Sequence, residues 1–287
     1  MSNALSRKLT PSKIGLAIAA PLAAAIFSIL ISSLAVIASK KSPMDAFKTM
    51  WEFGTTAGSL MEVINTATPY YIAAIAIAVT FRAGLFNIGV EGQLRLGALF
   101  SCYIGAMFVL PPVLHVAVVF IVAMTFGGLW AAFAAYLKVK RGVNEVISTI
   151  MLNALAGGLS AYLLSKHFAL VEEGSNNLQT KELPASAQIP DLMPLLRKLG
   201  VEDQPGGGVY GMFFVAVALG LIFWFVVNRT RFGFELRASG LNPIAARVSG
   251  VNSKKMTFMA LVISGAIAGL SGLPEVLGQT KQPDLPA

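Results

Sequence analysis

The sequence contains few charged residues: 13% of its 287 residues are Asp, Glu, Lys or Arg, whereas 55% are hydrophobic. Soluble domains carry about a quarter charged residues, so this composition excludes an ordinary soluble domain. The chain has one cysteine, Cys102, which excludes an intramolecular disulfide and argues against a cysteine metal cluster. Its two histidines, His115 and His167, lie far apart and lack the spacing of metal ligands. We therefore predict a membrane protein without a metal site.

Motifs of catalytic chemistry are also missing from the sequence. It contains no phosphate-binding loop, no nucleophile elbow and no zinc-binding signature. Its basic residues are scattered among short connections and do not form the clustered face of a nucleic-acid-binding domain. We therefore expect this chain to have no enzymatic activity of its own, no cofactor and no nucleic-acid partner.

Long apolar runs dominate what the sequence does contain. A membrane-spanning helix needs about 20 mostly apolar residues. Seven runs are candidates, at residues 14–38, 64–80, 96–110, 113–137, 146–164, 209–227 and 256–273. The first is too long for the apolar core of a signal peptide, so we interpret it as a retained helix. The sequence thus predicts an all-α, polytopic membrane protein with about seven spans.

Lysines and arginines in the connections predict the orientation of these spans, because cytoplasmic connections carry an excess of them. A cytoplasmic N-terminus puts most of the 22 basic residues on the cytoplasmic side. Residues 166–208 then form an extracytoplasmic loop and residues 228–255 a cytoplasmic loop. Lys40, Lys41 and Lys48 oppose this orientation, since it places them outside.

Residues 81–95, FRAGLFNIGVEGQLR, place glycines and polar residues between two short spans. The glycines weaken a continuous helix, and Asn87, Glu91 and Gln93 need hydrogen-bond partners or water. Two short spans around such a segment are typical of the broken helices that line a translocation path. The alternative is a solvated turn at the membrane surface, but Phe86 and its apolar neighbours argue against full exposure. We favour a partly inserted, broken or re-entrant element near 81–95.

Asn153 lies in the apolar body of the predicted span at 146–164. It could contact a transported substrate. It could also form a hydrogen bond between helices, which is the simpler role for an amide side chain within a membrane. The sequence leaves both interpretations open.

The segment LNPIAARVSG, residues 241–250, has the features of a short capped helix. Asn242 suits an N-cap, Pro243 the first helical turn and Gly250 the end of the helix. Its small residues let another protein surface approach, and Arg247 can anchor that surface through forked hydrogen bonds. A helix that merely closes a surface loop fits the same residues equally well.

Three segments taken together resemble the permeases of ABC importers. They read ATPYYIAAIAIAVTFRAGLFNIGVEGQLRLGAL, KVKRGVNEVISTIMLN and ELRASGLNPIAARVSGVNSKKMTFMALVISGAIAGLSG. These segments are similar to the branched-chain amino-acid and monosaccharide permease family, and most of all to its nucleoside branch. The resemblance implies a single transmembrane permease domain over residues 1–287, in the cytoplasmic membrane, that transports a nucleoside or a simple sugar. It also implies three kinds of partner: cytoplasmic ATPase subunits that bind the ATP, a second identical or different permease subunit, and an extracytoplasmic substrate-binding lipoprotein.

The resemblance also implies roles for particular residues. The GLNPIAARVSGV segment matches the family's ATPase-coupling region, which implies contact through Asn242, Pro243, Ala245, Ala246, Arg247, Ser249 and Gly250. The FNIGVEGQ segment implies a substrate path, for which the candidates are Phe86, Asn87, Glu91, Gln93 and Asn153. Family members continue beyond SGAIAGLSG with further spans. We therefore expect this chain to lack the family's last spans, either as a truncated product or as an unusually short member.

Two other functions are compatible with a polytopic membrane protein. An ion-coupled secondary transporter needs ionisable groups within the membrane, but the predicted spans contain no Asp or Glu at their centres. A truncated permease could instead act as a membrane scaffold that transports nothing. Uptake that depends on an ATPase partner would separate these three functions.

Overall fold

The computed structural model describes residues 11–170, 179–190, 192–198, 200 and 208–277 of the chain. These residues are almost entirely helical, which confirms the predicted all-α class. Two short strands, β1 (Ala169–Leu170) and β2 (Gln179–Thr180), pair in antiparallel fashion. Contacts divide the chain into two compact units, Met1–Leu60 and Met61–Ala287.

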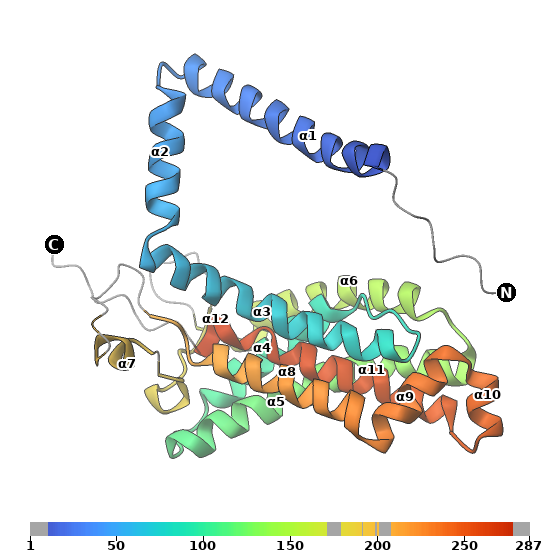
Figure 1. The fold of residues 1–287 in the computed structure, drawn as a ribbon. Coiled ribbons are helices and arrows are strands. Elements are labelled where there is room, and N and C mark those ends of the chain that lie inside the picture. The colour runs from blue at the N-terminus through green and yellow to red at the C-terminus, as the bar shows by residue number, and fades with distance from the viewer. Residues whose placement is uncertain (1–10, 171–178, 191, 199, 201–207, 278–287) are drawn as a thin grey trace. The chain divides into compact units, whose positions relative to one another are not determined.

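The first unit contains α1 (Pro11–Ala38), α2 (Pro43–Gly54) and the first residues of α3 (Ala57–Arg82), as Figure 1 shows. Within α1, Ile18–Ala38 is long and apolar enough to cross a membrane. Its side chains are almost all exposed, so this helix has an apolar surface all round, as a lipid-facing span does. Helix α1 covers the whole of the predicted span at 14–38.

The second unit contains most of α3 and the remaining helices. The longer ones are α4 (Val90–Gly105), α5 (Pro112–Tyr136), α6 (Glu145–Leu163), α8 (Met212–Arg229), α9 (Arg231–Leu241) and α11 (Ser253–Leu270). The shorter ones are α7 (Met193–Lys198), α10 (Pro243–Val248), α12 (Leu273–Leu277), the π-helices η1 (Leu137–Arg141) and η2 (Leu164–Phe168), and the 3₁₀ helix η3 (Ala185–Ala187). The predicted cytoplasmic loop at 228–255 is therefore largely helical.

Six helices of the described part of the chain are long and apolar enough to span a membrane: α1, α3, α5 continued by η1, α6 continued by η2, α8 and α11. Each of them coincides with a predicted span. The one predicted span not among these six, 96–110, overlaps α4, which starts earlier and ends at Gly105. Its 16 residues extend about 24 Å at 1.5 Å per residue, short of the roughly 30 Å of a hydrocarbon core.

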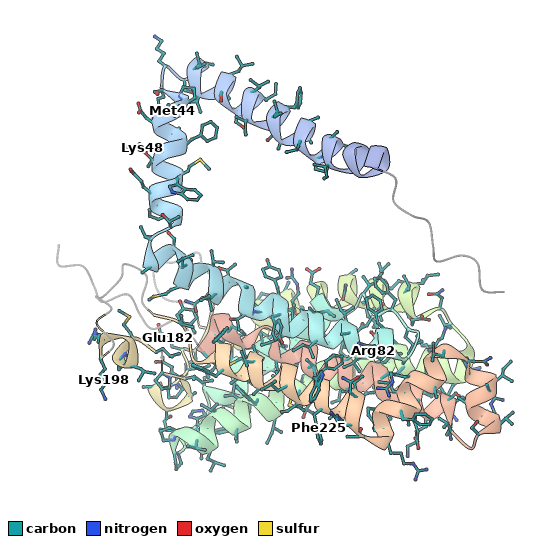
Figure 2. All side chains as sticks on the ribbon, in the orientation of Figure 1. Met44, Lys48, Arg82, Glu182, Lys198 and Phe225 are labelled. Atoms are coloured by element: carbon teal, nitrogen blue, oxygen red, sulfur yellow. The ribbon has the colours of Figure 1, made fainter. Side chains whose placement is uncertain are left out.

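Helix α11 packs closely against α5, α4 and α9 within the second unit (Figure 1). Glycines permit this approach. A Cβ atom on Gly127 of α5 would lie 2.9 Å from the Cα of Gly269 in α11, and one on Gly97 of α4 would lie 2.8 Å from the same atom. Small residues at helix interfaces allow close van der Waals packing where lipid removes the hydrophobic drive for helix association. The outer surface carries large apolar side chains, such as the 55% exposed Phe225 of α8 (Figure 2).

The segment between α6 and α8, which lies in the predicted extracytoplasmic loop at 166–208, is attached to the helices by two buried polar side chains. His115 of α5 is fully buried, with one ring nitrogen 2.8 Å from the Ser186 hydroxyl and the other 2.8 Å from the Gly105 carbonyl. Asn65 of α3 donates to the carbonyl of Gly208 at 3.0 Å. These contacts give His115 a structural role.

Candidate functional site

Helix α3 ends in a Schellman motif that turns the chain off the helix axis. Gly84 has a φ of +69°. The N–H of Leu85 donates to the carbonyl of Thr80 over 2.9 Å, and the N–H of Gly84 donates to that of Phe81 over 3.1 Å. These bonds satisfy carbonyls that the helix end leaves free, and glycine adopts the positive φ without strain. The chain then continues without helical structure over 85–89 until α4 begins.

The side chain of Asn87 holds this non-helical segment in place and is 1% exposed. Its nitrogen donates to Oε1 of Gln93 at 3.0 Å and to the hydroxyl of Ser264 in α11 at 2.9 Å. Its oxygen accepts from the N–H of Gly89 at 2.9 Å and from Nε2 of Gln93 at 3.2 Å. The Ser264 hydroxyl donates onward to the carbonyl of Ala76 in α3 at 2.6 Å. Asn87 thus uses its full hydrogen-bonding capacity inside the protein.

Asn153 connects α6 to the same segment. Its oxygen accepts from the N–H of Gly92 at 2.9 Å, and its nitrogen donates to the carbonyl of Ile88 at 2.8 Å. The N–H of Gly92 belongs to the first turn of α4, where a helix offers no internal partner. A Cβ on Gly92 would lie 2.9 Å from the Cβ of Ala156, so the two helices are close at this point. Asn153 therefore makes hydrogen bonds between elements, and its contact with a substrate stays a prediction.

Phe86 and Glu91 are the predicted path residues whose side chains reach the surface. Phe86 is 41% exposed and stacks on Phe81, with ring centroids 5.0 Å apart. The Glu91 carboxylate lies 2.8 Å from the guanidinium of Arg95, and both side chains are more than half exposed. The buried amides of Asn87 and Gln93 position the segment, whereas the side chains of Phe86 and Glu91 are exposed.

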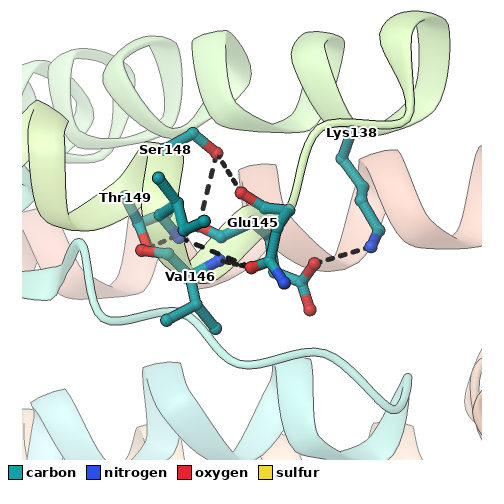
Figure 3. A network of polar contacts seen from close by, with 7 residues as sticks. Lys138, Glu145, Val146, Ser148 and Thr149 are labelled. Carbon is teal, nitrogen blue, oxygen red and sulfur yellow. Dashed lines mark hydrogen bonds and ion pairs between the residues drawn. The ribbon is translucent and has the colours of Figure 1, made fainter.

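An ion pair joins η1 to the start of α6 beside the non-helical segment (Figure 3). The ammonium of Lys138 lies 2.7 Å from the carboxylate of Glu145, and the two side chains are 31% and 11% exposed. Asn144 caps α6 by accepting from the N–H of Val146 at 2.8 Å. The backbone N–H of Phe86 also faces the Glu145 carboxylate. The pair thus links the turn between η1 and α6 to the broken element.

We expect Glu145→Gln to lower the free energy of unfolding by about 1–2 kcal/mol, because it leaves the half-buried Lys138 ammonium without its counter-ion. The exposed pair of Lys48 and Glu52, 3.8 Å apart, provides the control. Glu52→Gln should change stability by at most about 0.5 kcal/mol. Chemical denaturation of the two variants in detergent measures both effects. Equal losses would mean that burial adds nothing to the Lys138–Glu145 pair.

Helix α10 is defined by its caps. The side-chain oxygen of Asn242 accepts from the N–H groups of Ile244 and Ala245, each at 3.0 Å, and Pro243 occupies the first helical position. Gly250, with a φ of +83°, follows the end of the helix. The cap geometry predicted from the sequence is therefore confirmed.

The outer face of α10 is apolar and exposed. Ile244 and Val248 of α10 are 74% and 87% exposed, and Leu241, the last residue of α9, is 89% exposed. Ile244 and Val248 are four residues apart, so they share one side of the helix. None of these three was among the predicted coupling residues. The predicted coupling residues that are exposed are Asn242, Pro243, Ala245, Arg247, Ser249 and Gly250. An apolar stripe beside a cation is the composition expected of a protein-docking surface.

The opposite side of α9 and α10 is attached to the bundle. Ala246, which the sequence placed among the contact residues, is 4% exposed and packs in a cluster with Met256. A Cβ on Gly240 of α9 would lie 2.7 Å from the carbonyl carbon of Ala83, and one on Gly84 would lie 2.9 Å from the carbonyl oxygen of Gly240. Here backbone meets backbone with no flexible side chain between. A displacement of α9 therefore pushes directly on the turn that ends α3.

Comparison with known proteins places the chain among transport proteins. A family model described as the permease component of the branched-chain amino acid transport system matches residues 59–285. The chain belongs to this family. Its membership confirms the resemblance seen in the sequence and makes the chain a membrane permease subunit.

Several permeases are similar to this one over most of its length. The guanosine ABC transporter permease protein NupP of Bacillus subtilis is 34% identical over 90% of this chain and 71% of its own. The glucose ABC transporter permease protein TsgB13 of Haloferax volcanii is 33% identical over 92% and 69%. The nucleoside ABC transporter permease protein NupB of Lactococcus lactis is 29% identical over 88% and 69%. No solved structure matches this permease.

The structure adds residues that sequence reasoning missed. Ile244 and Val248 form the exposed apolar stripe of α10, and the exposed Leu241 ends α9 beside it. The four-residue spacing of Ile244 and Val248 is a signal that could have revealed the stripe. Ser264 lies 177 residues from its partner Asn87, and no local pattern announces that contact.

Proposed function

We propose that this permease is the transmembrane subunit of an ABC importer that carries a nucleoside or a related simple sugar across the cytoplasmic membrane, with its N-terminus in the cytoplasm. The names of its guanosine, nucleoside and glucose relatives support this choice of substrate class. The chain itself carries out no chemistry. Cytoplasmic ATPase subunits bind and hydrolyse the ATP, and this subunit needs neither a cofactor nor a metal.

The exposed stripe of α10 carries the proposal. Its Ile244 and Val248, together with Leu241 at the end of α9, have no cover within the described residues, although they lie in a segment with polar and charged neighbours. Burying such a stripe in a groove of an ATPase subunit would remove apolar surface from water, and Arg247 could pair with a carboxylate at its edge. The tight caps of α10 keep the stripe pre-organised, which lowers the entropy lost on docking.

The backbone contact between Gly240 and Gly84 supplies a route from the ATPase to the substrate path. Gly240 precedes the cap of α10 by two residues, and Gly84 begins the non-helical segment that carries Phe86. A movement of α10 driven by ATP would shift this segment as a unit, because Asn87 ties its polar groups together. Phe86 and Glu91, whose side chains are exposed, would then meet the substrate: the ring by stacking and the carboxylate by accepting hydrogen bonds from hydroxyls.

The remaining partners follow from the same assembly. A second permease subunit, identical or different, completes the path, and an extracytoplasmic lipoprotein delivers the substrate. Loop 166–208 would face that lipoprotein.

Replacing Ile244 and Val248 together by aspartate tests the proposal. We expect the variant to insert and unfold like the wild type, because both side chains are exposed, but to lose its co-purifying ATPase and to transport at least about 100-fold more slowly, since each buried apolar anchor is worth about 2 kcal/mol. Met44→Asp with Met50→Asp is the matched control, because these side chains of α2 are 75% and 68% exposed. ATPase binding and uptake that survive in the α10 variant would rule out α10 as the docking surface.

A further inference from the structure

A groove of about 510 Å³ lies between η1 and the first turns of α11, at the end of the second unit that carries α10. Its lining combines three lysines with apolar and aromatic side chains: Tyr136, Lys140, Lys254, Lys255, Phe258 and Met259. The transport function proposed above uses none of these residues. We therefore consider which ligand the groove could bind.

The lysines of the groove have no counter-ion among the residues that the structure describes. Lys254 and Lys255 stand in the first turn of α11, which contains no acidic residue. The helix dipole is positive at this end, so cations there are unfavourable and an anion is favoured. Within the part of the chain that the structure describes, neither they nor Lys140 forms an ion pair, whereas Lys138 on the same η1 turn has Glu145. A bound anion would relieve the repulsion between three cations that share one groove.

The other half of the lining indicates which anion. Tyr136, Phe258 and Met259 line the groove, and Tyr136 is 52% exposed. They lie at the ends of α5 and α11, two helices that are apolar and long enough to span the membrane. An aromatic side chain at such a helix end is typical of the membrane interface. A free inorganic anion would gain nothing from an apolar wall, but a lipid buries its glycerol and first methylenes there.

We propose that this groove binds the phosphate headgroup of an anionic phospholipid from the membrane leaflet at the α10 end. The three ammonium groups hold the phosphate, and the acyl chains run along the exposed apolar side chains of α5, such as Leu129 and Phe133. Basic pockets between spanning helices are suited to such headgroups, and each lysine near the surface contributes to the attraction. The π-helix η1 forms one side of the groove, where it contributes Val139 and Lys140 to the lining.

The test is native mass spectrometry of the purified chain titrated with dioleoyl-phosphatidylglycerol or with dioleoyl-phosphatidylcholine. We expect the wild type to retain phosphatidylglycerol preferentially. The triple variant Lys140→Gln, Lys254→Gln, Lys255→Gln should bind it roughly 100-fold more weakly, with its phosphatidylcholine binding unchanged. The control variant Lys40→Gln, Lys41→Gln, Lys48→Gln removes the same charge elsewhere and should bind like the wild type. A thermal unfolding curve for each variant shows that all are folded.

Three outcomes would overturn the proposal. Equal phosphatidylglycerol binding by the two triple variants would show that total charge, and not this groove, attracts the lipid. Displacement of the lipid by millimolar inorganic phosphate would show a site for a free anion. Unchanged lipid binding together with loss of the co-purifying ATPase would show that the lysines dock an acidic protein.

Discussion

Replacing Gly265 by alanine is expected to separate α5 from α11 and to lower the free energy of unfolding by about 3 kcal/mol or more. The added methyl group would overlap the Ala131 side chain and would lie 2.6 Å from the carbonyl oxygen of Gly127. Both obstacles belong to the facing helix, and one of them is backbone. Because a backbone atom cannot rotate away, relief requires the two helices to move apart.

Gly157 of α6 provides the control for this substitution. A methyl group at Gly157 would meet no atom within 4 Å. Gly157→Ala should therefore leave stability unchanged or raise it by up to about 1 kcal/mol, since alanine favours the helix over glycine. Denaturation of both variants in detergent, followed by circular dichroism, measures the contrast. A Gly265→Ala variant as stable as Gly157→Ala would mean that α5 and α11 are not in contact at this point.

Asn87→Leu is expected to have the second large effect, a loss of about 3 kcal/mol or more in the free energy of unfolding. The substitution leaves the buried N–H of Gly89 and the buried amide of Gln93 without their partner, and it removes the donor to the Ser264 hydroxyl, which keeps its bond to Ala76. Each buried polar group left without a partner costs about 1–3 kcal/mol. We also expect faster hydrogen exchange at the amides of residues 85–92, because their segment loses its central tie.

Asn228→Leu is the control for this second prediction. Asn228 is exposed, and among the described residues it donates to the carbonyl of Trp224 in its own helix and to no other group, so its replacement should change stability by less than about 0.5 kcal/mol. Asn87→Asp tests the donor bonds of this side chain separately from its acceptor bonds, since a carboxylate keeps the acceptor bonds and loses both donors. Unaltered exchange at Gly89 and Gly92 in Asn87→Leu would mean that the Asn87 side chain does not hold this segment in place.

Sequence reasoning located the broken element because its signal is local. Glycines and polar side chains interrupt two apolar runs near residues 81–95, and the structure ends one helix at Arg82 and begins the next at Val90. The predicted span at 96–110 was set several residues too late. A polar helix start such as Val90–Arg95 does not look like part of a span, and its stability depends on the Asn153 side chain of another helix.

For the candidate contact residues of α10 too, the sequence predicted the local features and missed those that depend on packing. The caps at Asn242 and Pro243 depend on neighbours within three residues, so the sequence predicted them correctly. Whether Ala246 or Ile244 faces outward depends on where α10 rests against Met256, which only the packing reveals. The sequence therefore included a buried alanine in the predicted contact and left out the exposed isoleucine.

By itself, the sequence determined the membrane class, most of the spans, the helix caps and the family of this permease. Apolar length, capping residues and motifs act over a few neighbouring positions, so they can be read along the chain. Only the tertiary structure decided how Asn87, Asn153 and Ser264 divide the polar contacts, that Gly240 touches Gly84, and that three lysines share a groove. These features join residues far apart in the chain, and their energies arise from burial and distance, which no local pattern encodes.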